Sequence, residues 1–140
     1  MDYYIIFSLA VIVLALLFLF LVWLRKKFAL RESALKKRVD KKFKEISQLL
    51  AIDNESAFRT AIIEADKLLD FVLKSKGVRG STLGERLKSS RGLIRDLNNI
   101  WFAHKVRNRL VHDLDSRIKR RETARVIKIF RGTINHLLNL

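Results

Sequence analysis

The chain has 140 residues and a mass of 16.4 kDa, and it contains neither cysteine nor proline. Its 29 lysine and arginine residues outnumber 14 acidic residues, which gives a formal net charge of +15 at pH 7. The lack of cysteine excludes disulfide scaffolds, thiolate metal sites and cysteine nucleophiles, and three histidines alone do not make a rich metal centre. Five glycines and no proline disfavour a turn-rich all-β fold, so we predict an all-α protein. We expect neither a metal nor a cofactor.

The first long segment, Tyr3 to Leu24, has 22 residues and no charged side chain. At about 1.5 Å of rise per residue, such a helix spans roughly 33 Å, enough to cross a hydrocarbon core about 30 Å thick. A buried core helix and a cleaved signal peptide are the alternatives. However, no polar face recurs with the helical period, and no positively charged region precedes the run. The sequence therefore predicts a transmembrane anchor over residues 1–24.

The charges that flank this span predict its orientation. One acid, Asp2, precedes the apolar run, whereas Arg25, Lys26 and Lys27 follow it directly. The positive-inside rule then places the N-terminus outside and the C-terminal domain in the cytoplasm. We therefore expect a single-pass protein of the cell membrane.

A basic amphipathic helix is predicted over residues 25–52. Residues 25–45 carry ten basic and three acidic side chains, a net charge of +7. Beside a membrane, each Lys or Arg contributes about 1 kcal/mol of attraction to anionic headgroups, so anionic lipid is a predicted partner of residues 25–45. The segment equally suits the first helix of a soluble domain, and its continuity with the anchor stays open. One helical stripe contains Leu35, Val39, Phe43, Ile46 and Leu50.

The remaining residues, 53–140, are predicted to form a helical domain. N-cap residues near Asn54 and a Thr82-to-Glu85 capping box each open a helix, and Gly77 is a natural helix stop. The apolar spacing predicts helices over about residues 57–76, 82–89 and 93–112, and from about residue 122 onward. Together these elements predict an antiparallel four- to five-helix bundle behind the anchor.

Side chains that carry chemistry concentrate in residues 101–113. His104, Asn108 and His112 share one helix face, because four residues advance the helix by only about 40° beyond a full turn. Arg107 and His112 lie about 140° apart on a regular helix, and an irregular helix end would reduce that separation. The structural alternative is a capped helix end, where a histidine interacts with the helix dipole and the other side chains are solvated.

The hexapeptide Arg107–His112, Arg-Asn-Arg-Leu-Val-His, resembles the Arg-polar-x-x-x-His motif of the HEPN superfamily (higher eukaryote and prokaryote nucleotide-binding domains). The stretch from about Ser56 to Leu140 is also similar to HEPN domains in helix order and length. The resemblance implies a helical bundle that dimerises, so that two motif copies face one cleft, and metal-independent ribonuclease activity. It assigns catalytic roles to Arg107, Asn108 and His112.

The implied reaction explains why a dimer is expected. One His112 cannot serve as base and acid at once, whereas two copies across a two-fold axis supply both. One imidazole would accept the proton of a ribose 2′-OH, and the other would protonate the leaving 5′-oxygen. Arg107 would bind the scissile phosphate, and Asn108 would orient His112 or a phosphate oxygen. Single-stranded RNA is the expected substrate, and DNA would survive because it lacks the 2′-OH.

Weaker candidates surround the motif. His104 could extend the polar face, although a satisfied interface histidine is the alternative; Glu64 and Asp66 could reach the site, although solvated helix faces usually carry such residues. A non-catalytic membrane-anchored module that dimerises and binds a partner protein, nucleotide or anionic lipid is the alternative function. A regulatory partner protein is a further candidate, because an exposed nuclease needs control. The candidate substrate-binding residues are His104, Lys105, Arg109, Lys119, Arg120 and Arg121.

Overall fold

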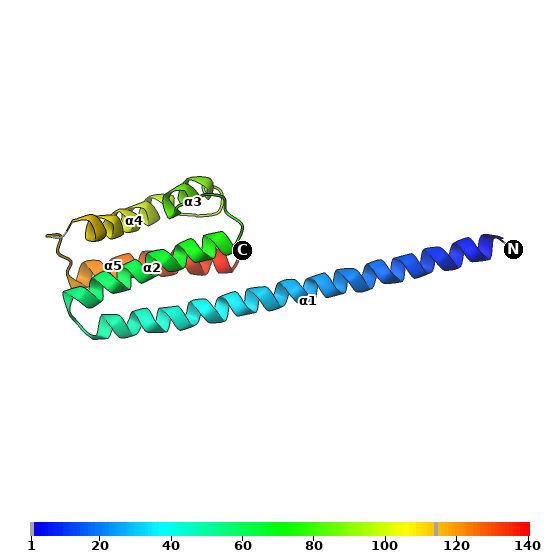
Figure 1. Ribbon diagram of the computed structural model, residues 1–140, viewed down its shortest axis with the longest axis horizontal. Helices are drawn as coiled ribbons and strands as arrows, with labels where there is room; N and C mark the ends of the chain where they lie inside the picture. Colours follow the sequence, from blue (N-terminus) through cyan, green and yellow to red (C-terminus); the bar gives the residue numbers. More distant parts are fainter. Residues whose placement is uncertain (1, 114) are drawn as a thin grey trace. The chain divides into compact units, whose positions relative to one another are not determined.

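The computed structural model describes residues 2–113 and 115–140, and every regular element in these ranges is an α-helix (Figure 1). No strand occurs among these described residues, which confirms the predicted all-α class. The chain divides into two compact units, Met1–Lys36 and Lys37–Leu140, and each is described by itself. The helices are α1 (Asp2–Ala51), α2 (Glu55–Ser75), α3 (Leu83–Ser89), α4 (Leu97–His112) and α5 (Arg120–Leu138).

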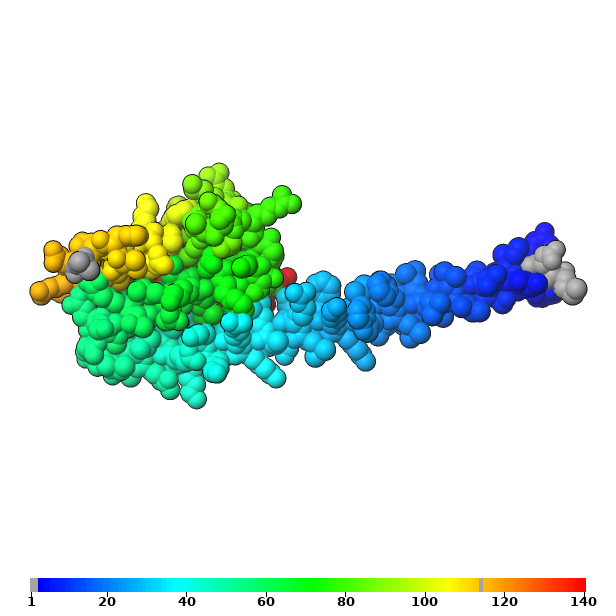
Figure 2. All heavy atoms as spheres, viewed as in Figure 1, coloured from blue at the N-terminus to red at the C-terminus, as the bar shows by residue number. Residues whose placement is uncertain are grey.

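The first unit consists of the N-terminal part of α1. An 18-residue window of this helix has a mean hydropathy of 3.3, and 0% of it is buried inside the protein. Figure 2 shows its side chains uncovered along the visible face of the helix. A core helix of a soluble protein would bury such side chains within its own chain, and this helix does not. Among the described residues, this is one helix near the N-terminus that is long and apolar enough to cross a membrane.

The second unit has an apolar core built from stripes on its helices. The last part of α1 contributes Val39, Phe43 and Ile46, which are buried as their helical spacing predicts. Helix α2 packs most extensively against α5, and α4 packs on both (Figure 1). Complete burial of one large aliphatic or aromatic side chain contributes about 1.5–3 kcal/mol. The largest fully buried side chains of α2 to α5 include Ile62, Leu69, Leu73, Leu87, Ile100, Phe130, Ile134 and Leu137.

Side-chain caps begin two of the helices where the sequence predicts them. The Asn54 Oδ1 atom accepts a hydrogen bond from the Ala57 N–H at 2.8 Å, and α2 starts there. Thr82 Oγ1 accepts from the Glu85 N–H at 3.2 Å at the start of α3. The Glu85 carboxylate accepts in return from the Ser81 N–H at 2.6 Å, one residue before the cap. Thr82 and Glu85 therefore both cap the N-terminus of α3, each through its side chain.

Two predicted helix starts are displaced. Helix α4 begins at Leu97 instead of about Leu93, because Asp96 is its N-cap and accepts from the Asn99 N–H at 3.1 Å. Turns occupy the chain just before this cap. Helix α5 begins at Arg120, two residues earlier than predicted. Polar residues carry no periodic signal, so the hydrophobic pattern alone locates such ends poorly.

Candidate functional site

Four polar side chains of α2 and α4 form a closed cycle of contacts. Asp66 Oδ1 lies 2.8 Å from His104 Nδ1, and His104 Nε2 lies 3.3 Å from Asn108 Nδ2. Arg107 Nη1 donates to Asn108 Oδ1 at 3.0 Å, and Arg107 Nε lies 3.2 Å from Asp66 Oδ2. We call Asp66, His104, Arg107 and Asn108 the polar ring. It joins three residues of α4 to one residue that lies far from them in the sequence.

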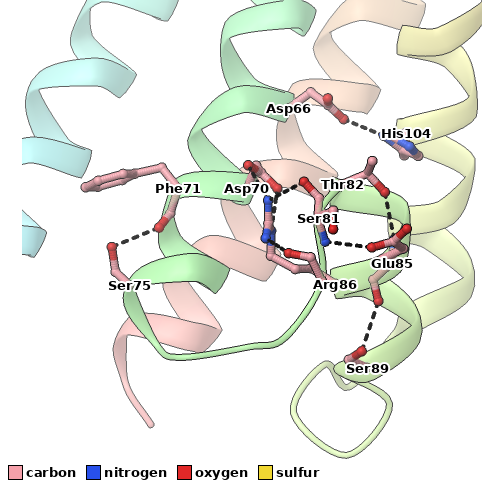
Figure 3. A network of polar contacts seen from close by, with 11 residues as sticks. Asp66, Asp70, Phe71, Ser75, Ser81, Thr82, Glu85, Arg86, Ser89 and His104 are labelled. Carbon is pink, nitrogen blue, oxygen red and sulfur yellow. Dashed lines mark hydrogen bonds and ion pairs between the residues drawn. The ribbon is translucent and has the colours of Figure 1, made fainter.

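Helix geometry places the α4 members together, and the packing of α2 supplies the fourth. Positions 104, 107 and 108 are three and four residues apart, so their side chains leave α4 on the side that faces α2. Asp66 is only 3% exposed and His104 is 9% exposed. A carboxylate at this depth costs several kcal/mol unless it is paired, and the ring gives Asp66 two partners. Figure 3 shows Asp66 of α2 pointing towards His104 of α4.

Arg107 is held only in part. Its side chain is 26% exposed, and its Nε atom is buried beside Asp66 in an ion pair that lacks hydrogen-bond geometry. Nη1 donates to Asn108, and within residues 2–113 and 115–140 no hydrogen bond of Nη2 is found. Nε and Nη1 are therefore held by the protein, and Nη2 is the nitrogen whose donors remain for a ligand such as a phosphate.

His112 lies outside the polar ring. It occupies the last turn of α4 and is exposed, and α4 stays helical up to this residue with Asp113 as its C-cap. The helix end therefore keeps Arg107 and His112 about 140° apart, and does not bring them together. In the described part of the chain, no hydrogen bond or ion pair joins His112 to the ring. The structure thus gathers Arg107 and Asn108 but leaves His112 facing outward.

The weaker candidates fall in several places. Lys105 is exposed on α4, and Lys119 and Arg121 are exposed at the start of α5. Arg109 pairs with Glu122 at 2.9 Å and Arg120 pairs with Asp53 at 3.0 Å, both in largely exposed positions. Exposed pairs of this kind contribute at most about 1 kcal/mol, so both arginines exchange partners easily. His104 instead belongs to the buried ring.

The two acids of α2 named with the site differ in outcome. Glu64 pairs with Lys67 at 3.0 Å and with Lys42 at 3.4 Å, and the Lys67 ammonium lowers the pKa of Glu64 below its ordinary range. Glu64 therefore lies on a charged helix face, which is the alternative that the sequence analysis gave for it. For Asp66 that interpretation is wrong, because its side chain is buried against α4. The available signal was its place beside Ile62 and Leu69 on the apolar stripe of α2.

A second polar cluster lies one helical turn further along α2 (Figure 3). The Arg86 guanidinium of α3 contacts Asp70 through Nε at 2.7 Å and through Nη2 at 3.1 Å. It also donates to the carbonyl oxygens of Gly80 and Ser81. The Asp70 carboxylate raises the pKa of Arg86 above its ordinary value. This cluster ties α3 and the preceding loop to α2.

Comparisons with known protein families, with curated proteins and with solved structures find no match to this chain. Among the described residues, no group of three or more metal-ligating side chains is arranged to hold a metal ion. Two groups at the end of α4 could therefore take part in chemistry. One is the partly exposed Arg107 guanidinium, which is paired with the buried Asp66 carboxylate, and the other is the exposed His112 imidazole.

Proposed function

We propose that this protein is a membrane-anchored, metal-independent endoribonuclease of the HEPN type that cleaves single-stranded RNA as a homodimer. Its second unit would then be an antiparallel helical bundle of that superfamily. One observation carries the proposal: the Arg-Asn-x-x-x-His motif ends α4 with Arg107 held by buried Asp66 and His112 exposed. A guanidinium positioned by a buried carboxylate and an accessible imidazole are the groups that phosphodiester cleavage needs.

The geometry of a single chain supports a dimer. Arg107 faces α2 and His112 faces outward, so one chain does not direct both groups at the same phosphate. A second copy placed by a two-fold axis brings a second His112 to the same linkage. Exposed Val111 beside His112 offers apolar surface that such a contact would cover.

The two imidazoles then divide the proton transfers. An imidazole with an ordinary pKa of about 6.5 populates both its neutral and its charged form near neutral pH. The neutral His112 of one copy takes the proton of the 2′-OH, which attacks the adjacent phosphorus, and the charged His112 of the other copy protonates the departing 5′-oxygen. Arg107 stabilises the charge on the non-bridging oxygens. The products carry a 2′,3′-cyclic phosphate and a free 5′-hydroxyl.

Exposed basic side chains support RNA as the substrate. Lys105, Arg109 and Arg121 lie on α4 and α5, and the Arg125 guanidinium lies 5.0 Å from the ring centroid of partly exposed Phe102. Lysine and arginine contacts with the phosphates of RNA make binding strongly dependent on salt concentration. An aromatic ring beside a cation also suits an unstacked base.

The N-terminal part of α1 would anchor this domain in the cell membrane, with the N-terminus outside and residues 37–140 in the cytoplasm. The 18-residue apolar window and the basic residues that follow it support this orientation. Lys27 Nζ lies 4.9 Å from the Trp23 ring centroid, a pair suited to the headgroup region. Exposed Phe28 and Leu30 lie among cationic side chains, which favours contact of residues 25–45 with anionic lipid.

The test uses the full chain in detergent, with single-stranded RNA and excess chelator. The wild type is expected to cleave RNA and to leave the matching DNA intact. His112→Ala and Arg107→Ala each lower the rate by about 10²-fold or more. His136→Ala is the matched control, since this histidine lies on α5 away from the motif, and it keeps the wild-type rate. Equal cleavage by all variants would indicate a contaminant and would overturn the assignment.

Oligomeric state gives a second test. Cross-linking and sedimentation of the same preparation should show a dimer, and dilution below the dimer's dissociation constant should abolish cleavage. A strictly monomeric active chain would contradict the two-histidine mechanism. Absence of cleavage by a dimeric wild type would instead favour the alternative, a membrane-anchored module that binds a partner protein, nucleotide or anionic lipid. The enclosure of Arg107 in the polar ring is the observation that favours this alternative.

A further inference from the structure

The polar ring has a consistent order of donors and acceptors when His104 is neutral. An ionised Asp66 accepts a hydrogen bond from His104 and forms an ion pair with Arg107, so the His104 Nδ1 atom carries the proton. His104 Nε2 is then a bare acceptor, and the Asn108 amide donates to it. The amide oxygen of Asn108 in turn accepts from Arg107 Nη1. Each of the three hydrogen-bonded links therefore joins a donor to an acceptor, and the fourth link is the ion pair of Arg107 with Asp66.

A second proton on His104 breaks this order. Protonation at Nε2 places an N–H opposite the Asn108 amide N–H₂, so two donors face each other. Asn108 restores that bond by turning its amide through half a revolution. The turned amide then presents its N–H₂ to Arg107 Nη1, which is also a donor, and that contact is lost.

We propose that His104 is a positioning residue that controls Arg107 through Asn108: the neutral, Nδ1-protonated imidazole closes the polar ring, and protonation opens it between Asn108 and Arg107. The inference concerns the ring itself and goes beyond the proposed ribonuclease activity. If that activity holds, opening the ring offers Arg107 Nη1 to a phosphate of the RNA.

His104 is the ring member whose protonation sets the direction of the hydrogen bonds, and the charged groups around it come from α2, α3 and α4. From α2, Asp66 faces its imidazole directly, and Asp70 lies one turn further along, where Arg86 of α3 neutralises it at 2.7 Å. From α4, Arg107 is the charged neighbour. The Trp101 ring packs edge-on to the imidazole with centroids 5.9 Å apart. In the described residues, no charged α5 side chain contacts the four members of the ring.

Nuclear magnetic resonance of the ¹⁵N-labelled full chain in detergent micelles tests this coupling without reference to cleavage. The titration runs from about pH 8 to about pH 5, and it follows the His104 ring nitrogens and the Arg107 Nε–H resonance together. We expect His104 to carry its single proton on Nδ1 at the alkaline end. The Arg107 Nε–H resonance is expected to shift with the same midpoint as the His104 ring nitrogens.

Two variants separate the coupling from mere proximity. In His104→Gln, one amide can donate to Asp66 and accept from Asn108 at every pH, so the Arg107 resonance is expected to lose its pH response. In Asn108→Asp, a carboxylate accepts from a protonated His104 and from Arg107 together, so acidification no longer separates position 108 from Arg107 and the wild-type response is again lost. This second variant keeps the imidazole and serves if the first fails to fold.

One control variant and three contrary results complete the test. His136→Gln removes a histidine that lines a separate pocket of about 390 Å³ between α4 and α5, and the coupling should persist. An Nε2-protonated His104 at the alkaline end would overturn the proposal. So would an Arg107 resonance that ignores the His104 titration, or one that still responds to pH in His104→Gln.

Discussion

Two arginine–carboxylate pairs meet α2 one turn apart, and they differ in how completely the arginine is used. Arg86 contacts Asp70 through two nitrogens and donates to two loop carbonyls as well. Arg107 has Asp66 beside Nε and Asn108 beside Nη1, and its side chain is still 26% exposed. The carboxylates show the opposite order, because the Asp70 side chain is 31% exposed and Asp66 is buried.

The comparison separates an arginine that builds the fold from one that we propose is positioned for a ligand. A guanidinium whose three nitrogens all donate to the protein stabilises a corner, as Arg86 does between α2, α3 and the loop before α3. A guanidinium held through Nε and Nη1 beside a buried carboxylate keeps its charge and its remaining donors for another partner. The predictions below test this difference.

The largest expected effect comes from removing the buried carboxylate. Asp66→Ala leaves the Arg107 charge without its buried partner and the His104 Nδ1–H without an acceptor, so the free energy of unfolding should fall by about 3–5 kcal/mol. Asp70→Ala is the matched variant. It should cost about 1–3 kcal/mol, because Arg86 keeps its two carbonyl partners.

Chemical denaturation of the full chain in detergent, followed by tryptophan fluorescence, measures both losses. If Asp70→Ala costs as much as Asp66→Ala, burial does not distinguish the two pairs and the comparison fails.

The second prediction replaces each arginine by lysine. Arg107→Lys should lower RNA cleavage by about 10²–10³-fold while changing stability little, because an ammonium cannot reproduce the planar donors at the phosphate. Arg86→Lys should lower the unfolding free energy by about 1.5–3 kcal/mol through loss of its charged hydrogen bonds. Its cleavage rate under folding conditions should equal that of the wild type.

Paired measurements of initial cleavage rate and unfolding midpoint on the same preparations check this expectation. A cleavage defect in folded Arg86→Lys as deep as that in Arg107→Lys would show that both arginines act only through the fold.

The smallest effect concerns the loop that Arg86 holds. The Ser81 N–H donates to Glu85, and this hydrogen bond lowers the pKa of the Glu85 carboxyl below its ordinary value of 4.5. Because the folded pKa is lower than the unfolded one, ionised Glu85 stabilises the fold above about pH 4.5, and this contribution disappears as the pH falls through the folded value. Glu85→Gln should therefore lower the melting temperature slightly at about pH 7.

Calorimetry at about pH 7 and about pH 3 tests the sign, since the difference between the wild type and Glu85→Gln should vanish at the acidic end. A difference that grows on acidification would mean that the Ser81 contact does not stabilise the ionised carboxylate.

Local patterns predicted most of the helices. The uncharged run, the apolar stripes and the caps at Asn54 and Thr82 act over a few residues, so they can be read without knowing what packs against them. The starts of α4 and α5 were missed by a few residues, because polar side chains there carry no period.

The site divides in the same way. The sequence alone predicted that His104 and Asn108 share one face of a helix, because helical spacing dictates it. Only the tertiary structure decided that Asp66 completes the ring from 38 residues away and that His112 faces solvent. The physical reason is that burial of a carboxylate depends on which helix covers it, and no local pattern specifies that pairing.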